Sequence, residues 1–186
     1  IADPSYIRGL KKLCQKNGVL LIFDEVQSGF GRTGKLFAYE LYKTKPDIMT
    51  LAKSLGGGVA IGAMAGSNRV MKSFVPGTHA ATFGGNPLAC SAALATLKVI
   101  TGKNFLNKAN ATGIYFLKRL KEIARENPIV KEARGTGMFL ALELDQPGND
   151  IVVDCMNRGF LINCIQQNVL RFLPPLNISR KDINSL

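Results

Sequence analysis

Apolar and polar positions along the chain show helical periodicity in some segments and apolar runs of strand length in others, and together these patterns predict an α/β fold. Residues 4–16 place apolar side chains on one helical face, and Gly18 then ends that helix. The run VLLIF at 19–23 is continuous and of strand length, which is typical of a strand buried on both faces. DIMTLA at 47–52 and IGAMAG at 61–66 predict two further strands. Strands that alternate with helices favour α/β structure.

The pattern changes in the later part of the chain. Asn86 and Pro87 form a strong helix start, with Asn as the cap and Pro at the first helical position. A long amphipathic helix follows from about residue 104 to about Glu126. The remaining pattern predicts a strand at 137–144, a helix near 149–158, strands at 160–163 and 169–173, and a helix starting at Ser179. We therefore expect two parts, residues 1–102 and a smaller α/β domain at 103–186.

Composition favours a packed soluble domain. The chain has 186 residues, of which 46% are hydrophobic and 20% charged. Its net charge of +11 could attract a polyanion, but the basic residues are scattered and lack interleaved aromatics, so we expect no nucleic-acid partner. No uncharged apolar run reaches the roughly 18 residues of a membrane span, and no membrane partner is expected.

The cysteines and the first residue bear on the compartment. The four cysteines share no C-x-x-C spacing and the chain has one histidine, which argues against a bound metal such as zinc. Free thiols fit a reducing compartment, and we expect the cytoplasm. The chain begins at Ile1 within a helical pattern, so we expect the translated protein to start upstream, which leaves an organelle targeting peptide open.

Two motifs that suggest other enzymes fail on inspection. GFGRTGK at 29–35 matches the first seven places of a P-loop, but Leu36 stands where a Ser or Thr must bind magnesium. Five residues also separate Gly29 from the strand that ends at Phe23, whereas a P-loop glycine follows its strand at once. AKSLG at 52–56 lacks the first glycine of the serine-hydrolase motif. Neither nucleotide hydrolysis nor serine hydrolysis is favoured.

An acid and a lysine remain, each at the end of a predicted strand. Asp24 follows one strand and Lys53 the next, beside a glycine run. Ligands of open α/β sheets bind at the carboxyl ends of strands, so both groups would face one crevice. Burial disfavours the charged form of a lysine, and a neutral amine can attack a carbonyl to form a Schiff base. A carboxylate can hold a protonated ring nitrogen, so the pair meets the minimum for a pyridoxal 5'-phosphate site.

Four longer stretches carry a family resemblance. LLIFDEVQSGFGRTGKLFAYE, PDIMTLAKSLGGGVAIGAM, TFGGNPLACSAALATL and NVLRFLPPLNIS together resemble the class III, or ornithine-type, pyridoxal phosphate aminotransferases. The resemblance runs in order from near residue 5 to near residue 183. It implies fold type I, with residues 1–102 as part of a large domain whose mixed, mostly parallel sheet has helices on both faces. Residues 103–186 would form the small C-terminal domain.

The resemblance also implies roles for individual residues. Asp24 would pair with the ring nitrogen, Val26 would pack on a ring face and Gln27 would reach the ring hydroxyl. Lys53 would be the Schiff-base lysine and would later move the substrate proton. Thr82 would bind the cofactor phosphate of a neighbouring subunit, which implies a homodimer with shared active sites.

Further roles concern the substrate. Arg171 of LRFLPP would clamp the substrate α-carboxylate, a task that suits a planar guanidinium. Ala81 stands where the family usually has a small hydroxyl residue, so one hydrogen bond near the phosphate or substrate would be missing. Arg32 would anchor a loop at the rim of the site.

The family's N-terminal half carries a phosphate-binding loop and a ring-stacking aromatic that this chain lacks, so we expect an incomplete piece of the enzyme. The expected reaction is transfer of an amino group from an amino acid to a 2-oxo acid. GFLINCIQQNVLRFLPPLNIS favours N-acetylornithine as donor; ornithine, succinyl-diaminopimelate and 4-aminobutyrate remain alternatives.

Overall fold

A computed structural model describes all residues, 1–186, and divides into two compact units. The first unit comprises residues 1–30 and 35–105, and the second comprises residues 31–34 and 106–186. The boundary expected between residues 102 and 103 separates the large and small domains of the full-length enzyme, and it stays a prediction. Within this chain, the short segment Gly31–Gly34 packs with the second unit.

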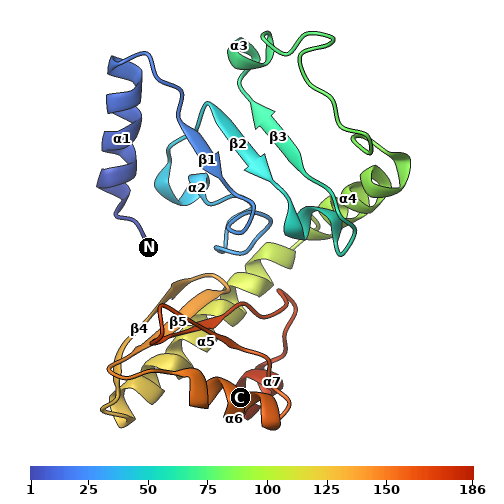
Figure 1. Ribbon diagram of the computed structural model, residues 1–186. Coiled ribbons are helices and arrows are strands. Elements are labelled where there is room, and N and C mark those ends of the chain that lie inside the picture. The colour runs from blue at the N-terminus through green and yellow to red at the C-terminus, as the bar shows by residue number, and fades with distance from the viewer. The chain divides into compact units, whose positions relative to one another are not determined.

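The first unit holds a three-stranded sheet with the order β1-β2-β3 (Figure 1). β1 (Ile22–Asp24) and β2 (Ile48–Leu51) are parallel, while β3 (Ala63–Gly66) is antiparallel to β2, so the sheet is mixed. The helices are α1 (Pro4–Lys16), α2 (Tyr39–Tyr42), α3 (Asn68–Met71) and α4 (Pro87–Ile100), and η1 (Lys53–Gly56) is a 3-10 turn.

The first predicted strand is shorter and more exposed than expected. β1 starts at Ile22, which keeps 55% of its surface exposed, and Val19 keeps 57%. Burial on both faces is therefore wrong for this chain, because β1 lies at the edge of the sheet and pairs only with β2. The helix expected at residues 4–16 is confirmed as α1, with Asp3 as its cap.

The start of α4 is also confirmed. The side chain of Asn86 accepts a hydrogen bond from the backbone of Ala89 (2.9 Å), and Pro87 opens the helix. The glycine run at 56–58 lets α4 pack closely on η1. Gly57 has φ +58°, and a β-carbon there would lie 2.5 Å from the hydroxyl oxygen of Thr96.

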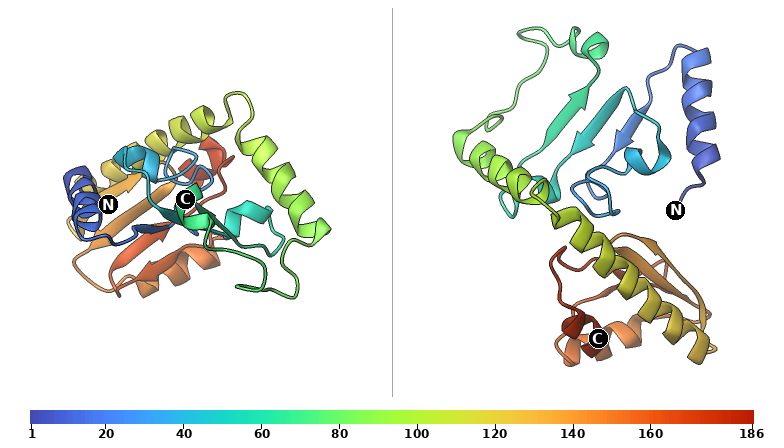
Figure 2. Two further views of the ribbon diagram at one scale, coloured as in Figure 1. Left: turned by 90° about the horizontal axis from the view of Figure 1, so that it is seen from above. Right: turned by 180° about the vertical axis from the view of Figure 1, so that it is seen from behind.

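The second unit holds an antiparallel sheet with the order β4-β5-β7-β6 (Figure 2). Its strands are β4 (Val130–Thr136), β5 (Phe139–Leu144), β6 (Asn163–Ile165) and β7 (Val169–Phe172), and its helices are α5 (Phe105–Glu126), α6 (Asn149–Asn157) and α7 (Arg180–Ser185). The helix start at Ser179 is confirmed, since its hydroxyl accepts from Asp182 N. β4 was not anticipated because its sequence, VKEARGT, is largely polar.

One face of this sheet forms the core of the second unit. Residues of β5 alternate between half-buried and buried, and the buried ones pack against Phe116 and Leu120 of α5. α5 also carries Gly113, where a β-carbon would lie 2.1 Å from the carbonyl oxygen of Gly137. The helix can therefore approach the β4–β5 turn only without a side chain at that position.

None of the helices combines the length and the apolar character that a membrane-spanning helix needs. The four cysteines are unpaired, and no group of three or more His, Cys, Asp or Glu side chains lies close enough together to hold a metal ion.

Candidate active site

Asp24 and Lys53 lie at the carboxyl ends of two adjacent parallel strands of the first sheet, β1 and β2. Asp24 is the last residue of β1 and pairs in register with Thr50 of β2, three residues before Lys53. The Thr50 hydroxyl (3.1 Å) and the Val26 backbone (3.0 Å) both donate to Oδ1 of Asp24. Oδ2 accepts no hydrogen bond from this chain, so one carboxylate oxygen is oriented at the sheet edge and available to another donor.

The backbone at Lys53 is strained. Its φ is +45°, a conformation that costs a non-glycine residue about 1–3 kcal/mol and is enriched at functional sites. The strain turns the chain sharply from β2 into η1, directly after the strand. The side chain of Lys53 is exposed, so the burial expected from the sequence is not provided by the residues of this chain.

An open cleft in the first unit brings three of the predicted residues together. Its volume is about 1040 Å³, and Lys53, Ala81 and Thr82 all line it. Gly84, Gly85 and Asn86, at the start of α4, lie along the same wall. Asp24, Val26 and Gln27 do not line this cleft, and of these Val26 and Gln27 are half-buried.

Glu25 is a residue that the sequence reasoning missed. It is 1% exposed, and its carboxylate accepts hydrogen bonds from the backbone of Ala38 (2.7 Å) and Tyr39 (2.8 Å) and from the Ser28 hydroxyl (2.9 Å). The carboxylate therefore closes the turn that follows Asp24 and satisfies the start of α2. The sequence shows the acidic pair Asp24 and Glu25, but no neighbouring residue indicates that Glu25 is the buried one.

Arg171 lies on β7 of the second unit and is half-buried. Its Nε donates to Oδ1 of Asn163 on β6 (3.1 Å). No Asp or Glu of this chain forms an ion pair with it. Asn163 is thus its one side-chain hydrogen-bond partner within this chain, and the Nη groups can still donate to a carboxylate.

Arg32 sits within the second unit as an anchor. Its guanidinium donates to the carbonyl oxygens of Met138 (3.2 Å) and Pro174 (2.6 Å), and the Met138 backbone donates back to the Arg32 carbonyl (2.8 Å). Burial lowers the pKa of Arg32 from its ordinary value. Its bonds are all to backbone carbonyls, so Arg32 fixes the chain just beyond β7 and the apparent P-loop is a docking segment.

The donor set of the first unit fits pyridoxal phosphate. Lys53 offers a primary amine and Asp24 a free carboxylate oxygen, which suit an aldehyde and a protonated ring nitrogen respectively. Thr82 offers a hydroxyl, which suits a phosphate of the same chain's site or of a neighbouring subunit's site. A mixed α/β sheet with such groups at its strand ends favours the class of pyridoxal phosphate enzymes.

The comparisons with known proteins agree. The family model "Aminotransferase class-III" matches residues 1–186. The chain is 47% identical over its full length to an acetylornithine aminotransferase of Methanocaldococcus jannaschii, of which it covers 47%. The chain belongs to the class III aminotransferases, a family of enzymes that use pyridoxal phosphate.

Solved structures share this fold. An ornithine aminotransferase from Toxoplasma gondii, described with partial occupancy of PLP at its active site, superposes with a TM-score of 0.92 at 38% identity, covering 100% of this chain and 45% of that one. An acetylornithine aminotransferase from Elizabethkingia anophelis gives a TM-score of 0.91 at 31% identity, covering 99% and 50%. The chain thus spans about half the length of the relatives it matches.

Proposed function

We propose that this chain is part of an enzyme that transfers the terminal amino group of N-acetylornithine to 2-oxoglutarate, giving N-acetylglutamate semialdehyde and glutamate, a step of arginine biosynthesis. The observation that carries the proposal is the placement of Asp24 and Lys53 at the ends of adjacent parallel strands. The choice of donor is supported by the similarity to acetylornithine aminotransferases over the full chain. Ornithine, succinyl-diaminopimelate and 4-aminobutyrate are the alternative donors.

Each residue of the first unit has a separate task in this proposal. Pyridoxal phosphate, when bound, supplies an aldehyde and an electron-accepting ring. Asp24 keeps a proton on the ring nitrogen through its free Oδ2, while Thr50 holds the other oxygen. Lys53 is the residue that would hold the cofactor through its amine, and the same amine would move the substrate proton. Val26 packs on the ring and Gln27 donates to its hydroxyl.

Ala81 and Thr82 concern the phosphate and the substrate. Thr82 donates its hydroxyl to the cofactor phosphate, in the site of a neighbouring subunit. Ala81 supplies no hydroxyl there, so this enzyme makes one hydrogen bond fewer than relatives with Ser or Thr at that place. In the second unit, Arg171 binds the substrate α-carboxylate with its planar guanidinium.

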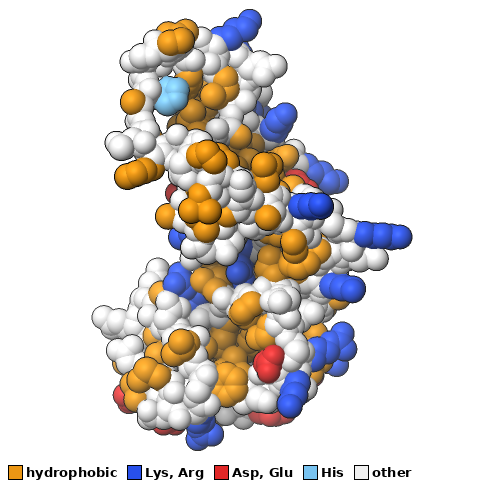
Figure 3. Space-filling view, turned by 90° about the vertical axis from the view of Figure 1, so that its right-hand side faces the viewer, with side chains coloured by type: hydrophobic (Ala, Val, Ile, Leu, Met, Phe, Trp, Pro, Cys, Tyr) orange, Lys and Arg blue, Asp and Glu red, His pale blue; other side chains and the backbone are white.

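A homodimer with shared active sites completes the proposal, in which residues 1–102 belong to a large domain and 103–186 to a small one. Its support is an apolar surface on and beside α4, where Figure 3 shows hydrophobic side chains. Phe83, Leu88 and Leu94 keep 81%, 74% and 68% of their surface exposed. Scattered exposed apolar residues are common, but two large ones on α4 and a third just before it favour a protein partner. Sedimentation of the full-length enzyme should show a dimer.

The central test is covalent. The full-length enzyme that contains this chain, loaded with pyridoxal phosphate and reduced with borohydride, should carry the label on Lys53 when its peptides are mapped. A Lys53→Ala variant should lose the label and the activity, whereas Lys35→Ala, a matched change at an exposed lysine, should keep both. Label on another lysine in the wild type would overturn the assignment.

Donor choice has its own assay. Turnover with N-acetylornithine should exceed turnover with ornithine, succinyl-diaminopimelate or 4-aminobutyrate at equal concentration.

A second candidate is that these residues by themselves are inactive, because the chain spans about half of its relatives. If the isolated 186 residues turned over N-acetylornithine as fast as the full-length enzyme, this candidate would be wrong.

A further inference from the structure

The sheet of the second unit carries a row of polar side chains on the face opposite its core. In register across the four strands stand Arg134 of β4, Ala141 of β5, Arg171 of β7 and Asn163 of β6. Residues directly opposite one another in an antiparallel sheet point to the same side. Both arginines therefore project from one face, with a small alanine between them.

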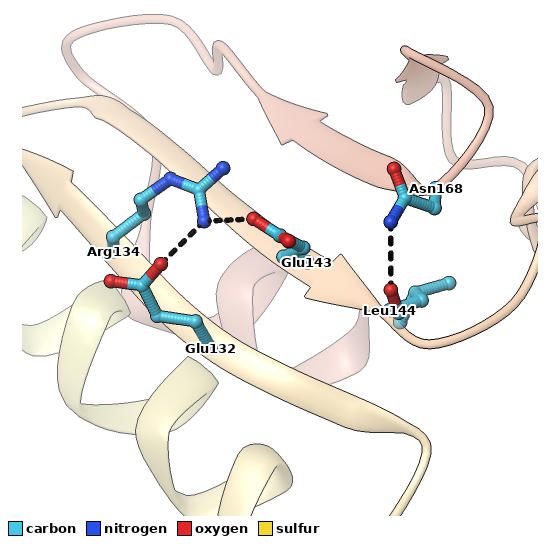
Figure 4. Close-up of polar contacts among 5 residues, drawn as sticks. All are labelled: Glu132, Arg134, Glu143, Leu144 and Asn168. Carbon is cyan, nitrogen blue, oxygen red and sulfur yellow. Dashed lines mark hydrogen bonds and ion pairs between the residues drawn. The ribbon is translucent and has the colours of Figure 1, made fainter.

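The two arginines of this row have opposite surroundings. Arg134 donates to Glu132 (2.5 Å) and to Glu143 (2.6 Å), so two carboxylates surround it (Figure 4). The hydrogen bond that Arg134 donates to Glu143 raises the pKa of Arg134, and the bond to Glu132 contributes. Arg171 instead has one side-chain partner, the neutral oxygen of Asn163. Arg134 is thus paired with two carboxylates, whereas Arg171 has no acidic partner within this chain.

The geometry of the contact with Asn163 determines which edge of the Arg171 guanidinium can bind a carboxylate. A guanidinium offers paired N–H groups along two edges, one of which includes Nε. Asn163 occupies Nε at 3.1 Å, which leaves the edge formed by the two Nη groups for a bidentate carboxylate. The contact also fixes the plane of the guanidinium, and it adds no negative charge that would compete with an anionic ligand.

We infer that Asn163 is a positioning residue for the substrate carboxylate: it holds the plane of Arg171 through Nε and directs the two Nη groups toward the ligand. The inference rests on the proposed role of Arg171. Asn163 itself does not touch substrate in this scheme. Its neutral amide is the feature that matters, because an acidic residue at the same place would hold the guanidinium equally well and cancel its charge.

The test uses the full-length enzyme and two substitutions at this position. Asn163→Leu removes the acceptor at similar size, and Asn163→Asp keeps an acceptor but adds a charge. Each should raise the dissociation constant of glutarate, measured by equilibrium dialysis, and the KM for 2-oxoglutarate by about tenfold, the equivalent of one hydrogen bond to a charged group. The kcat should stay within about twofold, because binding that is equal in ground and transition states changes KM alone.

Asn168, in the turn between β6 and β7, provides a matched control. Its side chain donates to the Leu144 carbonyl (2.8 Å; Figure 4) and forms no hydrogen bond with Arg171. Asn168→Leu should lower the melting temperature and leave glutarate binding unchanged. If Asn163→Leu behaves in the same way, with a lower melting temperature and unchanged binding, its role is structural and the inference is wrong.

Arg171→Leu distinguishes the carboxylate-binding role of Arg171 from the positioning role of Asn163. If it weakens glutarate binding strongly while Asn163→Leu does not, Arg171 binds the carboxylate as proposed and the positioning role of Asn163 is wrong. If Arg171→Leu leaves glutarate binding unchanged, the proposed clamp itself is wrong, and the role of Asn163 falls with it.

Discussion

The buried carboxylate of Glu25 offers the sharpest test of how this fold supports its site. Glu25 accepts hydrogen bonds from two backbone N–H groups, those of Ala38 and Tyr39, and from the Ser28 hydroxyl. Glu25→Gln preserves the shape of the side chain but replaces one acceptor oxygen with an NH₂ group. The better of the two amide orientations keeps the oxygen facing Ala38 and Ser28 and turns the NH₂ toward the Tyr39 N–H.

The expected loss follows from that orientation. One buried backbone N–H is left without an acceptor, at a cost of about 1–3 kcal/mol, and the surviving bonds lose their charge assistance. We expect a total decrease of about 3 kcal/mol in the free energy of unfolding. With a urea m-value of roughly 2 kcal/mol/M, the midpoint of unfolding should fall by about 1.5 M.

Glu40 is the matched control for this substitution. It is exposed and accepts one backbone hydrogen bond, from Phe37 (3.0 Å). Glu40→Gln should therefore change the free energy of unfolding by less than about 0.5 kcal/mol. If urea titration showed equal midpoints for Glu25→Gln and Glu40→Gln at unchanged m-values, the buried carboxylate would not be holding this turn as argued.

Three further outcomes are expected. Replacing Arg32 with Ala should cost about 2–4 kcal/mol in urea unfolding, because two carbonyls lose a charged donor; a cost below about 0.5 kcal/mol would contradict its role as an anchor. The hydrogen bond from Lys11, first among several contacts, holds the pKa of Asp47 below its ordinary value of 3.8. A depressed folded-state pKa gives stability that is present above the unfolded pKa and is lost as the pH falls through the folded pKa. The urea midpoint of the wild type should therefore decrease when the pH is lowered below about 4, and the decrease should be smaller in Asp47→Asn. Replacing Gly57 with Ala should cost about 2–4 kcal/mol by thermal denaturation, from its positive φ and its approach to Thr96, and a neutral result would show that α4 can shift.

A control for the glycine substitution lies in α1. A β-carbon at Gly9 would meet no atom within 4 Å, and its φ is not positive. Gly9→Ala should therefore be neutral or slightly stabilising, because alanine favours a helix by up to about 1 kcal/mol over glycine. Loss of stability at both positions would point to a general intolerance of change rather than to the packing of α4.

The sequence by itself determined the features that depend on neighbouring residues. The caps at Asn86 and Ser179 depend on groups three residues away, and both form as expected. The missing hydroxyl after Lys35 excluded a P-loop for an equally local reason. Four long motifs were also enough to indicate the family, which the family model confirms over residues 1–186.

The tertiary structure decided what depends on distant parts of the chain. Only the fold shows that Glu25 is buried while Asp24 is exposed, because the donors that hold Glu25 lie 13 and 14 residues away. Arg32 finds its acceptors 106 and 142 residues along the chain. Asn163 and Arg171 are only eight residues apart, but it is the register of β6 and β7 that places them opposite one another. Register and burial arise from packing between elements, which local spacing does not encode.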